Sequence, residues 1–304
     1  MLHTMPSGIG LLIAGMLAVL PLSVLAAGEQ PAPRLRILTI NLLYKSPVAG
    51  RDKRFDTIAR YIRDQRDEGR PVDALLVQEG CSGLLAGTGD SIRDLRRTLN
   101  EYGLRYHMCS QPAFGVSPFL ALRIGILTNR EVLYSEAEDF RNPPGEWYEK
   151  FPLLGRKRVA MVGIAHPIGR VNLFTTHLSS GGGEDIRKGQ AEDLLRFVNK
   201  VSARHPAEAT VLSGDMNTQP GTRAYNLLAG AFTDSFAAAA PGSPGCTFNL
   251  PGNPHCQGIT SKTRRIDYIF FTAAGLHVDT SEVVFNRDGW WVSDHCGLLT
   301  TLSK

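Results

Sequence analysis

The chain has 304 residues, of which 43% are hydrophobic and 20% are charged. This length and composition can bury a large core, which excludes an intrinsically disordered protein and allows one large domain or two ordinary ones. The formal net charge of +4 is mild, so it permits an anionic substrate without indicating one.

The N-terminal stretch MLHTMPSGIGLLIAGMLAVLPLSVLAA is an apolar run that is interrupted at Pro21 and ends in small residues. This pattern predicts a secretory signal peptide over residues 1–26, cleaved after Ala26 or Ala27, and therefore a secreted or periplasmic protein. Because residues 1–26 contain no Lys or Arg, an uncleaved N-terminal anchor is the alternative.

The chain contains five cysteines, an odd number for a protein bound for an oxidising compartment. Cys246 and Cys256 flank the Pro-, Gly- and Asn-rich loop CTFNLPGNPHC, and we expect a disulfide between them that holds this loop. No CxxC or Cys/His spacing typical of zinc sites is present, so we expect no structural zinc.

The N-terminal half of the mature chain predicts strands alternating with two amphipathic helices. We expect strands at residues 35–41, 72–80, 104–108, 122–128 and 131–136. The helices are indicated by apolar residues at helical spacing, namely Phe55, Ile58, Ala59 and Ile62, and then Ile92, Leu95 and Leu99.

The C-terminal half begins with a predicted β-hairpin, residues 156–180, that turns at Gly169. A helix follows, with one apolar face made by Ala191, Leu194, Leu195, Val198 and Val201. Further strands are expected at residues 208–217, 264–272, 276–285 and 296–302, with a looser region at 230–263.

This mixed order of strands and helices, with hairpins in both halves, predicts an α/β fold. We expect a four-layer sandwich in which two packed mixed β-sheets are flanked by helices, rather than one doubly wound sheet. No internal linker or short-period repeat divides residues 34–304, so we expect a single domain there.

Polar side chains stand at the ends of these predicted strands, where a packed core would favour another aliphatic residue. They are Asn41, Glu79, His177, Asp215, Asn217, Asp267, Asp294 and His295. Asp215 and Asn217 lie two residues apart on one strand and project to the same face. Taken singly, each residue has an ordinary explanation as a turn residue, a solvated strand end or a buried histidine.

Asp267 is harder to explain singly, because a carboxylate among Ile, Tyr and Phe requires a partner when it is buried. A shared site explains the whole set better than eight independent roles. Glu79, Asp294 and Asn41 offer the oxygen ligands that Mg²⁺ prefers, and neutral imidazoles provide bases and proton donors.

The segments TIN, QE, TTHL, GDMN, RIDY and SDH occur in this order between residues 39 and 295. Together they resemble the endonuclease/exonuclease/phosphatase superfamily, whose members include DNase I, exonuclease III, inositol polyphosphate 5-phosphatases and neutral sphingomyelinases. The resemblance spans nearly all of the mature chain and implies a DNase I-like catalytic domain over residues 34–304. It also implies hydrolysis of a phosphodiester with Mg²⁺, for which Mn²⁺ or Ca²⁺ are the alternatives, and we expect a monomer.

Carried over to this sequence, the resemblance implies a role for each strand-end residue. Glu79 would be the main metal ligand, with Asn41 and Asp294 beside it. Asp215 would orient the attacking water, and Asn217 would hydrogen-bond a phosphate oxygen. His177 would donate to a phosphate or protonate the leaving oxygen, and His295 would be the general base oriented by Asp267. A phosphate-contacting arginine would be Arg156 or Arg158, between which the resemblance does not choose.

These motifs specify the substrate less closely than they specify the fold and the reaction. The loop TFNLPGNP before RRIDYIF resembles neutral sphingomyelinases, and Trp290, Trp291 and the aromatic segment 145–152 suit a membrane surface, which favours a phospholipid. The same aromatic and basic residues suit nucleic acid, so a secreted DNase-type endonuclease is the alternative. A second alternative is a secreted binding or toxin-like protein that keeps the fold without turnover.

Overall fold

The computed structural model describes residues 32–44, 50–116, 118–141, 156–272 and 275–304. Residues Ala32–Lys304 cluster as one compact unit. The predicted signal peptide and the aromatic segment 145–152 lie outside the described residues. Within the described part of the chain, no helix combines the length and the apolar character needed to cross a bilayer.

Two six-stranded β-sheets form the centre of this unit, and each contains both parallel and antiparallel neighbours. The first sheet has the order β11-β12-β1-β2-β4-β3 and is built from β1 (Arg34–Asn41), β2 (Ala74–Ser82), β3 (His107–Val116), β4 (Leu120–Thr128), β11 (His277–Val284) and β12 (Gly297–Ser303). The second has the order β5-β6-β7-β8-β10-β9 and is built from β5 (Val132–Asp139), β6 (Arg158–His166), β7 (Gly169–His177), β8 (Ala209–Asp215), β9 (Thr233–Asp234) and β10 (Asp267–Thr272).

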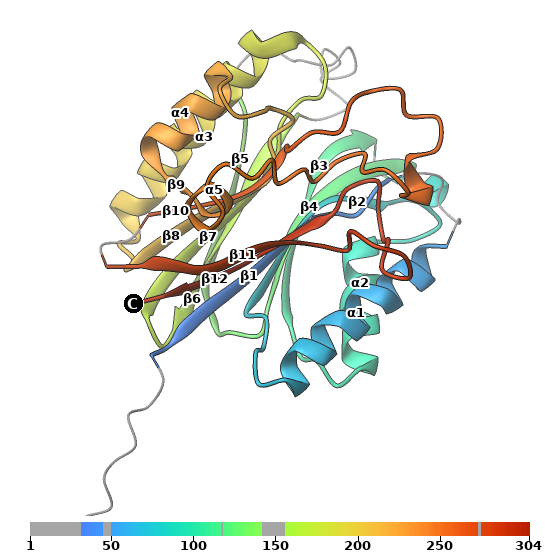
Figure 1. Ribbon diagram of the computed structural model, residues 1–304, viewed down its shortest axis with the longest axis horizontal. Helices are drawn as coiled ribbons and strands as arrows, with labels where there is room; N and C mark the ends of the chain where they lie inside the picture. Colours follow the sequence, from blue (N-terminus) through green and yellow to red (C-terminus); the bar gives the residue numbers. More distant parts are fainter. Residues whose placement is uncertain (1–31, 45–49, 117, 142–155, 273–274) are drawn as a thin grey trace, which may run out of the picture. The chain divides into compact units, whose positions relative to one another are not determined.

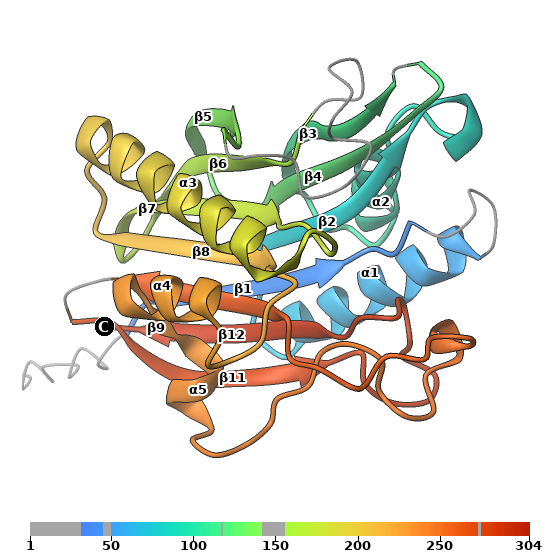
Figure 2. The same cartoon turned by 90° about the horizontal axis from the view of Figure 1, so that it is seen from above.

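Helices cover the outer faces of the two sheets, which gives four layers (Figures 1 and 2). Helices α1 (Arg51–Asp67) and α2 (Ser91–Glu101) lie on the first sheet, and α3 (Gly183–Arg204) and α4 (Arg223–Ala231) lie on the second. Three apolar clusters fill the spaces between successive layers. The predicted four-layer sandwich with two mixed sheets is therefore confirmed.

The central strands are buried on both faces, because one face packs on helices and the other on the opposite sheet. In β1, every residue after Arg34 is buried, and β8 is buried at every position except Thr210. This explains the continuous apolar runs in the sequence, which lack the alternation of a half-exposed strand.

Strand register brings the polar strand ends together at one edge of the sandwich. In the second sheet, Asp215 at the end of β8 pairs with His177 of β7 on one side and with Asp267 of β10 on the other. In the first sheet, Asn41 of β1 pairs with Gln78 of β2. The register between β2 and β4 shifts between Val77 and Gly80, at the point where Glu79 has a φ of 51°. This irregularity redirects the Glu79 side chain, as β-bulges do at functional sites.

Some predicted elements differ from the structure. The strand expected at residues 104–108 instead begins at His107 and continues to Val116, where it forms a hairpin with β4. The looser region expected from residue 230 begins within the end of α4 and contains β9 and the short helix α5 (Ser235–Ala239). The sequence pattern did not predict β9 and α5, because they are short and depend on capping residues. Asp234, for example, accepts hydrogen bonds from the amides that begin α5.

The expected disulfide between Cys246 and Cys256 is not present, since all five cysteines are thiols and all lie in the described part of the chain. The loop has other anchors. The Cys256 thiol approaches the carbonyl oxygen of Asp294 at 3.5 Å, and Asn253 donates from its side chain to the carbonyl oxygen of Ser293 at 2.8 Å. These contacts hold the loop without a covalent bridge.

Leu76→Ala tests the core between the sheets. Leu76 is fully buried there, so truncation leaves a cavity and should lower the free energy of unfolding by about 2–5 kcal/mol in urea titrations. The control Leu133→Ala removes a side chain of a residue that is 43% exposed and should change it by less than about 0.5 kcal/mol. Equal losses in both variants would contradict this packing.

Candidate functional site

Asp215 lies at the centre of the site, because the side chains of Asn41, His177 and His295 all reach its carboxylate. Its Oδ2 accepts a hydrogen bond from Asn41 Nδ2 at 3.1 Å and lies 3.5 Å from His177 Nε2 and 3.7 Å from His295 Nε2. Asn41 Nδ2 also donates to Glu79 Oε1 at 3.0 Å. One amide group therefore joins the two acids, across the two sheets.

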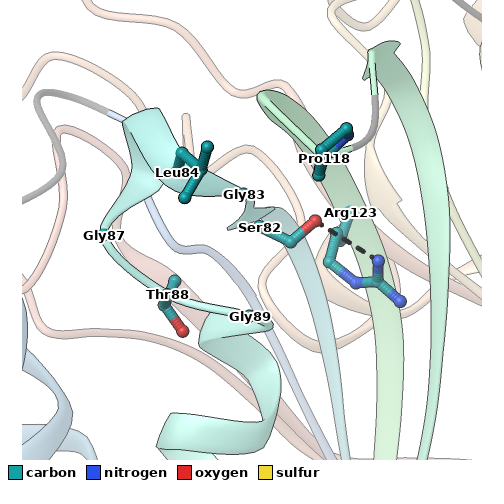
Figure 3. Close-up of a pocket in the computed structure, with 8 residues that line it drawn as sticks. All are labelled: Ser82, Gly83, Leu84, Gly87, Thr88, Gly89, Pro118 and Arg123. Atoms are coloured by element: carbon teal, nitrogen blue, oxygen red, sulfur yellow. Dashed lines mark hydrogen bonds between the residues drawn. The ribbon is translucent and has the colours of Figure 1, made fainter.

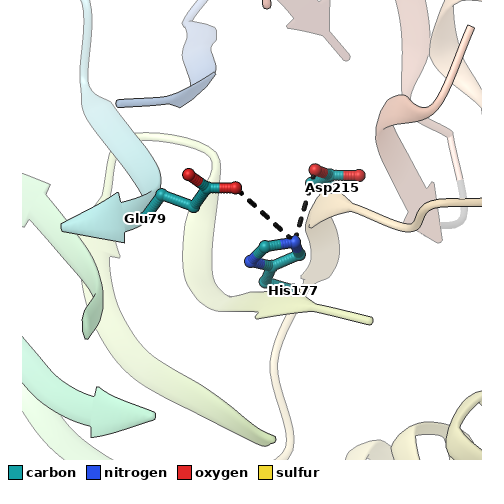
Figure 4. Close-up of side chains that lie close together, drawn as sticks. All are labelled: Glu79, His177 and Asp215. Carbon is teal, nitrogen blue, oxygen red and sulfur yellow. Dashed lines mark ion pairs between the residues drawn. The ribbon is translucent and has the colours of Figure 1, made fainter. Parts of the chain in front are cut away.

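Figure 4 shows the first of two compact groups in which a metal-ligating atom of each residue lies within 4.8 Å of the others, formed by Glu79, His177 and Asp215. The imidazole of His177 lies between the two carboxylates, 4.0 Å from Glu79 Oε1. Asp215, Asp267 and His295 form the second group. Asp215 belongs to both, so the two groups form one continuous cluster.

His295 and Asp267 are joined by the hydrogen bond between Nδ1 and Oδ2, at 2.8 Å. Asp267 is fully buried and His295 is 4% exposed, so this pair lies away from water. Thr247 Oγ1 donates to the same Asp267 oxygen at 2.6 Å. With Nδ1 held by Asp267, the ring directs Nε2 toward Asp215.

The turn after β8 positions Asn217. Its backbone amide donates to Asp215 Oδ1 at 2.9 Å, and its φ of 47° places it in the left-handed region that asparagine tolerates. Its Nδ2 donates to the carbonyl oxygen of Leu178 at 3.1 Å and lies 3.1 Å from His177 Nε2. An Asx-turn therefore brings Asn217 to the same cluster as Asp215.

The ionisation of these groups follows from burial and from their mutual charges. Burial lowers the pKa of His177 well below its usual value, and the nearby Lys157 and His295 act in the same direction. Burial raises the pKa of Asp215 to about 7, against the effect of His295 and with that of Asp267. Burial disfavours the charged form of His295, but Asp267 and Asp215 outweigh it and raise its pKa to about 10. His177 therefore favours its neutral form, and His295 favours its protonated form.

Asp294 lies outside both compact groups but belongs to the same electrostatic neighbourhood. Burial raises its pKa, against the effect of His295 and with that of Glu79. Arg54 ties the adjoining segments together, because its Nη1 donates to the carbonyl oxygens of Leu42 and Val292. Leu42 follows Asn41, and Val292 precedes Asp294 by two residues.

The donor set fits a hard divalent cation. Burial is the main cause of the raised pKa values of Asp215 and Asp294, and the Glu79 carboxylate repels both of these acids and adds to the effect. A cation among them would relieve that repulsion, and carboxylate and amide oxygens are the ligands that Mg²⁺, Mn²⁺ and Ca²⁺ use. Asn41 hydrogen-bonds Glu79, and the charge of Glu79 acts on Asp294. Both residues therefore lie close enough to Glu79 to help hold a cation.

The basic segment at residues 156–158 has a buried lysine between its two arginines. Arg158 forms an ion pair with Asp139 at 2.7 Å, and Arg156 is exposed. Between them, Lys157 is 4% exposed, and its charge acts on His177. Successive residues of an extended segment point to opposite sides, so Lys157 faces the cluster while Arg158 faces β5.

Sequence reasoning missed two residues that contribute directly to the site, Lys157 and Thr247. Alternation along the strand could have identified Lys157. Thr247 gave no such signal, because it acts through a tertiary contact: its loop pairs with the segment at His295, where Cys296 N donates to Thr247 O at 2.6 Å. All eight strand-end residues of the expected set lie in or beside the cluster.

Comparison with known proteins agrees with this geometry. Residues 38–295 match the model of the Endonuclease/Exonuclease/phosphatase family. Among curated proteins, no sequence match to this chain was found. Solved structures share the fold at low identity, so they support the architecture alone.

Three of them illustrate the likeness. A family protein from Leptotrichia buccalis is 20% identical, with 89% of this chain and 100% of that chain covered at a TM-score of 0.67. One from Beutenbergia cavernae is 21% identical, with 89% and 72% covered at 0.66. The human Nocturnin catalytic domain with bound sulfate is 17% identical, with 89% and 93% covered at 0.65.

The family match covers most of the chain and ends at His295, the last member of the cluster. The fold, the order of the motifs and their convergence at one sheet edge agree with it. The chain therefore belongs to the endonuclease/exonuclease/phosphatase family.

Proposed function

We propose that this chain is a secreted phosphodiesterase that depends on a divalent metal and hydrolyses its substrate by attack of water on phosphorus. The observation that carries the proposal is the buried His295–Asp267 pair, whose free ring nitrogen lies 3.7 Å from Asp215 in the same cluster as Glu79. Such an arrangement pairs a proton acceptor with the oxygen groups that position water.

Glu79, Asp294 and Asn41 would hold the metal. When bound, the cation supplies a Lewis acid that stabilises negative charge on the phosphate oxygens. Mg²⁺ is the proposed ion, with Mn²⁺ or Ca²⁺ as the other hard cations that this oxygen set suits.

The remaining residues have distinct tasks in this proposal. Asp215 accepts a hydrogen bond from the attacking water, and the neutral form of His295 takes the proton at Nε2. Asp267 holds the ring by Nδ1 and stabilises the imidazolium that forms. Asn217 and the neutral His177 hydrogen-bond the phosphate oxygens, and Lys157 adds positive charge beside them.

For the substrate class we favour a phospholipid diester, because the loop that carries Thr247 resembles that of neutral sphingomyelinases and contacts the catalytic pair directly. A nucleic acid is the alternative. It is supported by Arg264, whose guanidinium stacks 4.9 Å from the Phe248 ring, itself 4.8 Å from His295. A protein that binds without turnover would not need the complete set of eight residues.

Removing the base or the water-positioning acid should abolish turnover. We expect His295→Ala and Asp215→Ala each to lower kcat on a chromogenic phosphodiester by about a hundredfold or more, because general-base catalysis contributes on that scale. The control His277→Ala alters an exposed histidine on β11 and should keep full activity. Wild-type turnover by His295→Ala would remove this residue from the role of base.

Metal removal provides a second test with two readouts. EDTA should stop hydrolysis, and added Mg²⁺ should restore it and raise the Tm, because a ligand that binds only the folded state stabilises it. In Glu79→Gln the Mg²⁺-dependent rise in Tm should be weakened, since a carboxylate ligand is lost. Turnover that persists in EDTA would contradict the metal-dependent mechanism.

The raised pKa of His295 predicts a pH dependence of stability in EDTA. The folded pKa of about 10 lies above the unfolded value of about 6.5, so the stabilisation is complete below about pH 6.5 and is lost as pH rises toward 10. Between pH 7 and 9, the unfolding free energy should fall by up to about 1.4 kcal/mol per pH unit more in wild type than in His295→Gln. The exposed-histidine control His277→Gln should behave as wild type, and equal slopes in all three would refute the linkage.

A further inference from the structure

Exposed apolar side chains gather on two neighbouring loops, one of which follows β2. Leu84 is 74% exposed, Leu85 61%, Phe119 56% and Val116 36%, and we call these four residues the apolar tip. Leu84 and Leu85 belong to the 3₁₀ turn η1 (Leu84–Ala86), and the other two flank the turn between β3 and β4. Among the described residues, the other large apolar residue that is comparably exposed is Leu133, on β5.

The two loops are joined by backbone hydrogen bonds, so the apolar tip is one fixed structure. The amide of Leu84 donates to the carbonyl oxygen of Pro118, and that of Leu85 to Phe119, each at 2.9 Å. Gly83 has a φ of 109°, and a Cβ atom there would lie 2.5 Å from the carbonyl oxygen of Phe119. Glycine is therefore required for the two loops to approach so closely.

The backbone donors of the apolar tip are also satisfied internally. The amides of Ala86 and Gly87 donate to Gly83 and Leu84, and the amide of Phe119 donates to Val116 at 2.8 Å. An apolar medium penalises unpaired amide groups, so this arrangement allows the tip to enter one without exposing unpaired donors there.

Charge is absent from the tip and appears directly behind it. Residues 82–89 and 116–122 contain no Asp, Glu, Lys or Arg. Beneath the tip lies a hollow of about 510 Å³ whose wall includes Arg123 (Figure 3). Arg123 donates to Ser82 Oγ at 3.4 Å and pairs with the buried Asp90 at 3.0 Å. The apolar tip can contact acyl chains while the guanidinium behind it contacts headgroup phosphates, so the two layers match those of a phospholipid surface.

One of the two loops of the tip directly follows β2, the strand that carries Glu79. Glu79 and Ser82 both belong to β2, and η1 begins two residues after its end. A surface that receives the tip is thereby brought close to the cluster around Glu79.

We propose that the apolar tip docks this chain on a phospholipid surface and presents the site to diesters held there, which rests on the proposed function for its catalytic part. Four partly exposed side chains cover less than the ~800 Å² per partner that a stable protein interface buries. A bilayer needs no such area, because each inserted side chain contributes independently. Since the tip carries no charge, docking does not require anionic lipid.

The test measures partitioning onto phosphatidylcholine vesicles by cosedimentation in EDTA, with and without phosphatidylserine. The compact unit Ala32–Lys304 is used beside the full chain, so that the N-terminal apolar segment does not obscure the result. Replacing Leu84, Leu85 and Phe119 together by serine should weaken binding about tenfold or more on both vesicle types. The matched control Leu133→Ser should bind as wild type, and unchanged Tm values would show that all variants fold.

The outcomes separate docking from catalysis. Turnover of a soluble chromogenic diester should be unchanged in the triple variant, while hydrolysis of vesicle lipid falls. Vesicle binding that is absent in wild type, or equal in wild type and triple variant, overturns docking and leaves the proposed activity standing. Tip-dependent binding without turnover of any diester refutes the activity alone. A wild-type dimer that the triple variant dissociates, without vesicle binding, would assign the tip to a second copy and overturn the proposal.

Discussion

The buried hydrogen bond between His295 and Asp267 is the interaction on which the rest of the site depends. A carboxylate with no exposed surface is strongly disfavoured unless it has partners, and Asp267 has two, the imidazole and the Thr247 hydroxyl. The pair also joins the halves of the molecule, because Asp267 begins β10 of the second sheet and His295 precedes β12 of the first. Orientation of one ring nitrogen therefore depends on how the two sheets pack.

Register converts this packing into a site. His177, Asp215 and Asp267 are neighbours across three adjacent strands, and a shift of one residue in any of them would turn its side chain to the opposite face. From the other sheet, Asn41 contacts both Glu79 and Asp215. The irregularity at Glu79 shows that regular pairing alone does not direct every group, and that local backbone strain contributes.

Electrostatic repulsion within the cluster is a consequence of this convergence. Burial and neighbouring acids raise the pKa values of Asp215 and Asp294, and both of these acids favour the protonated form of His295. Burial, with the charges of Lys157 and His295, keeps His177 neutral. Because the cluster contains both acids and cationic groups, it suits the binding of a cation and of a phosphate. One loop of the apolar tip follows β2 with its backbone already paired, so the proposed docking surface and Glu79 are connected by one strand.

The sequence by itself determined the fold class, the order of the motifs and the identity of the eight strand-end residues, because long apolar runs and polar residues that interrupt them are local signals. It did not determine Thr247 or Lys157 as site residues, nor the absence of a Cys246–Cys256 bridge. Nor did it show that Leu84 and Phe119, 35 positions apart in the printed numbering, belong to one exposed surface. Only the tertiary structure decided these, because each depends on which segments distant in sequence come into contact and on which side of the chain then faces solvent.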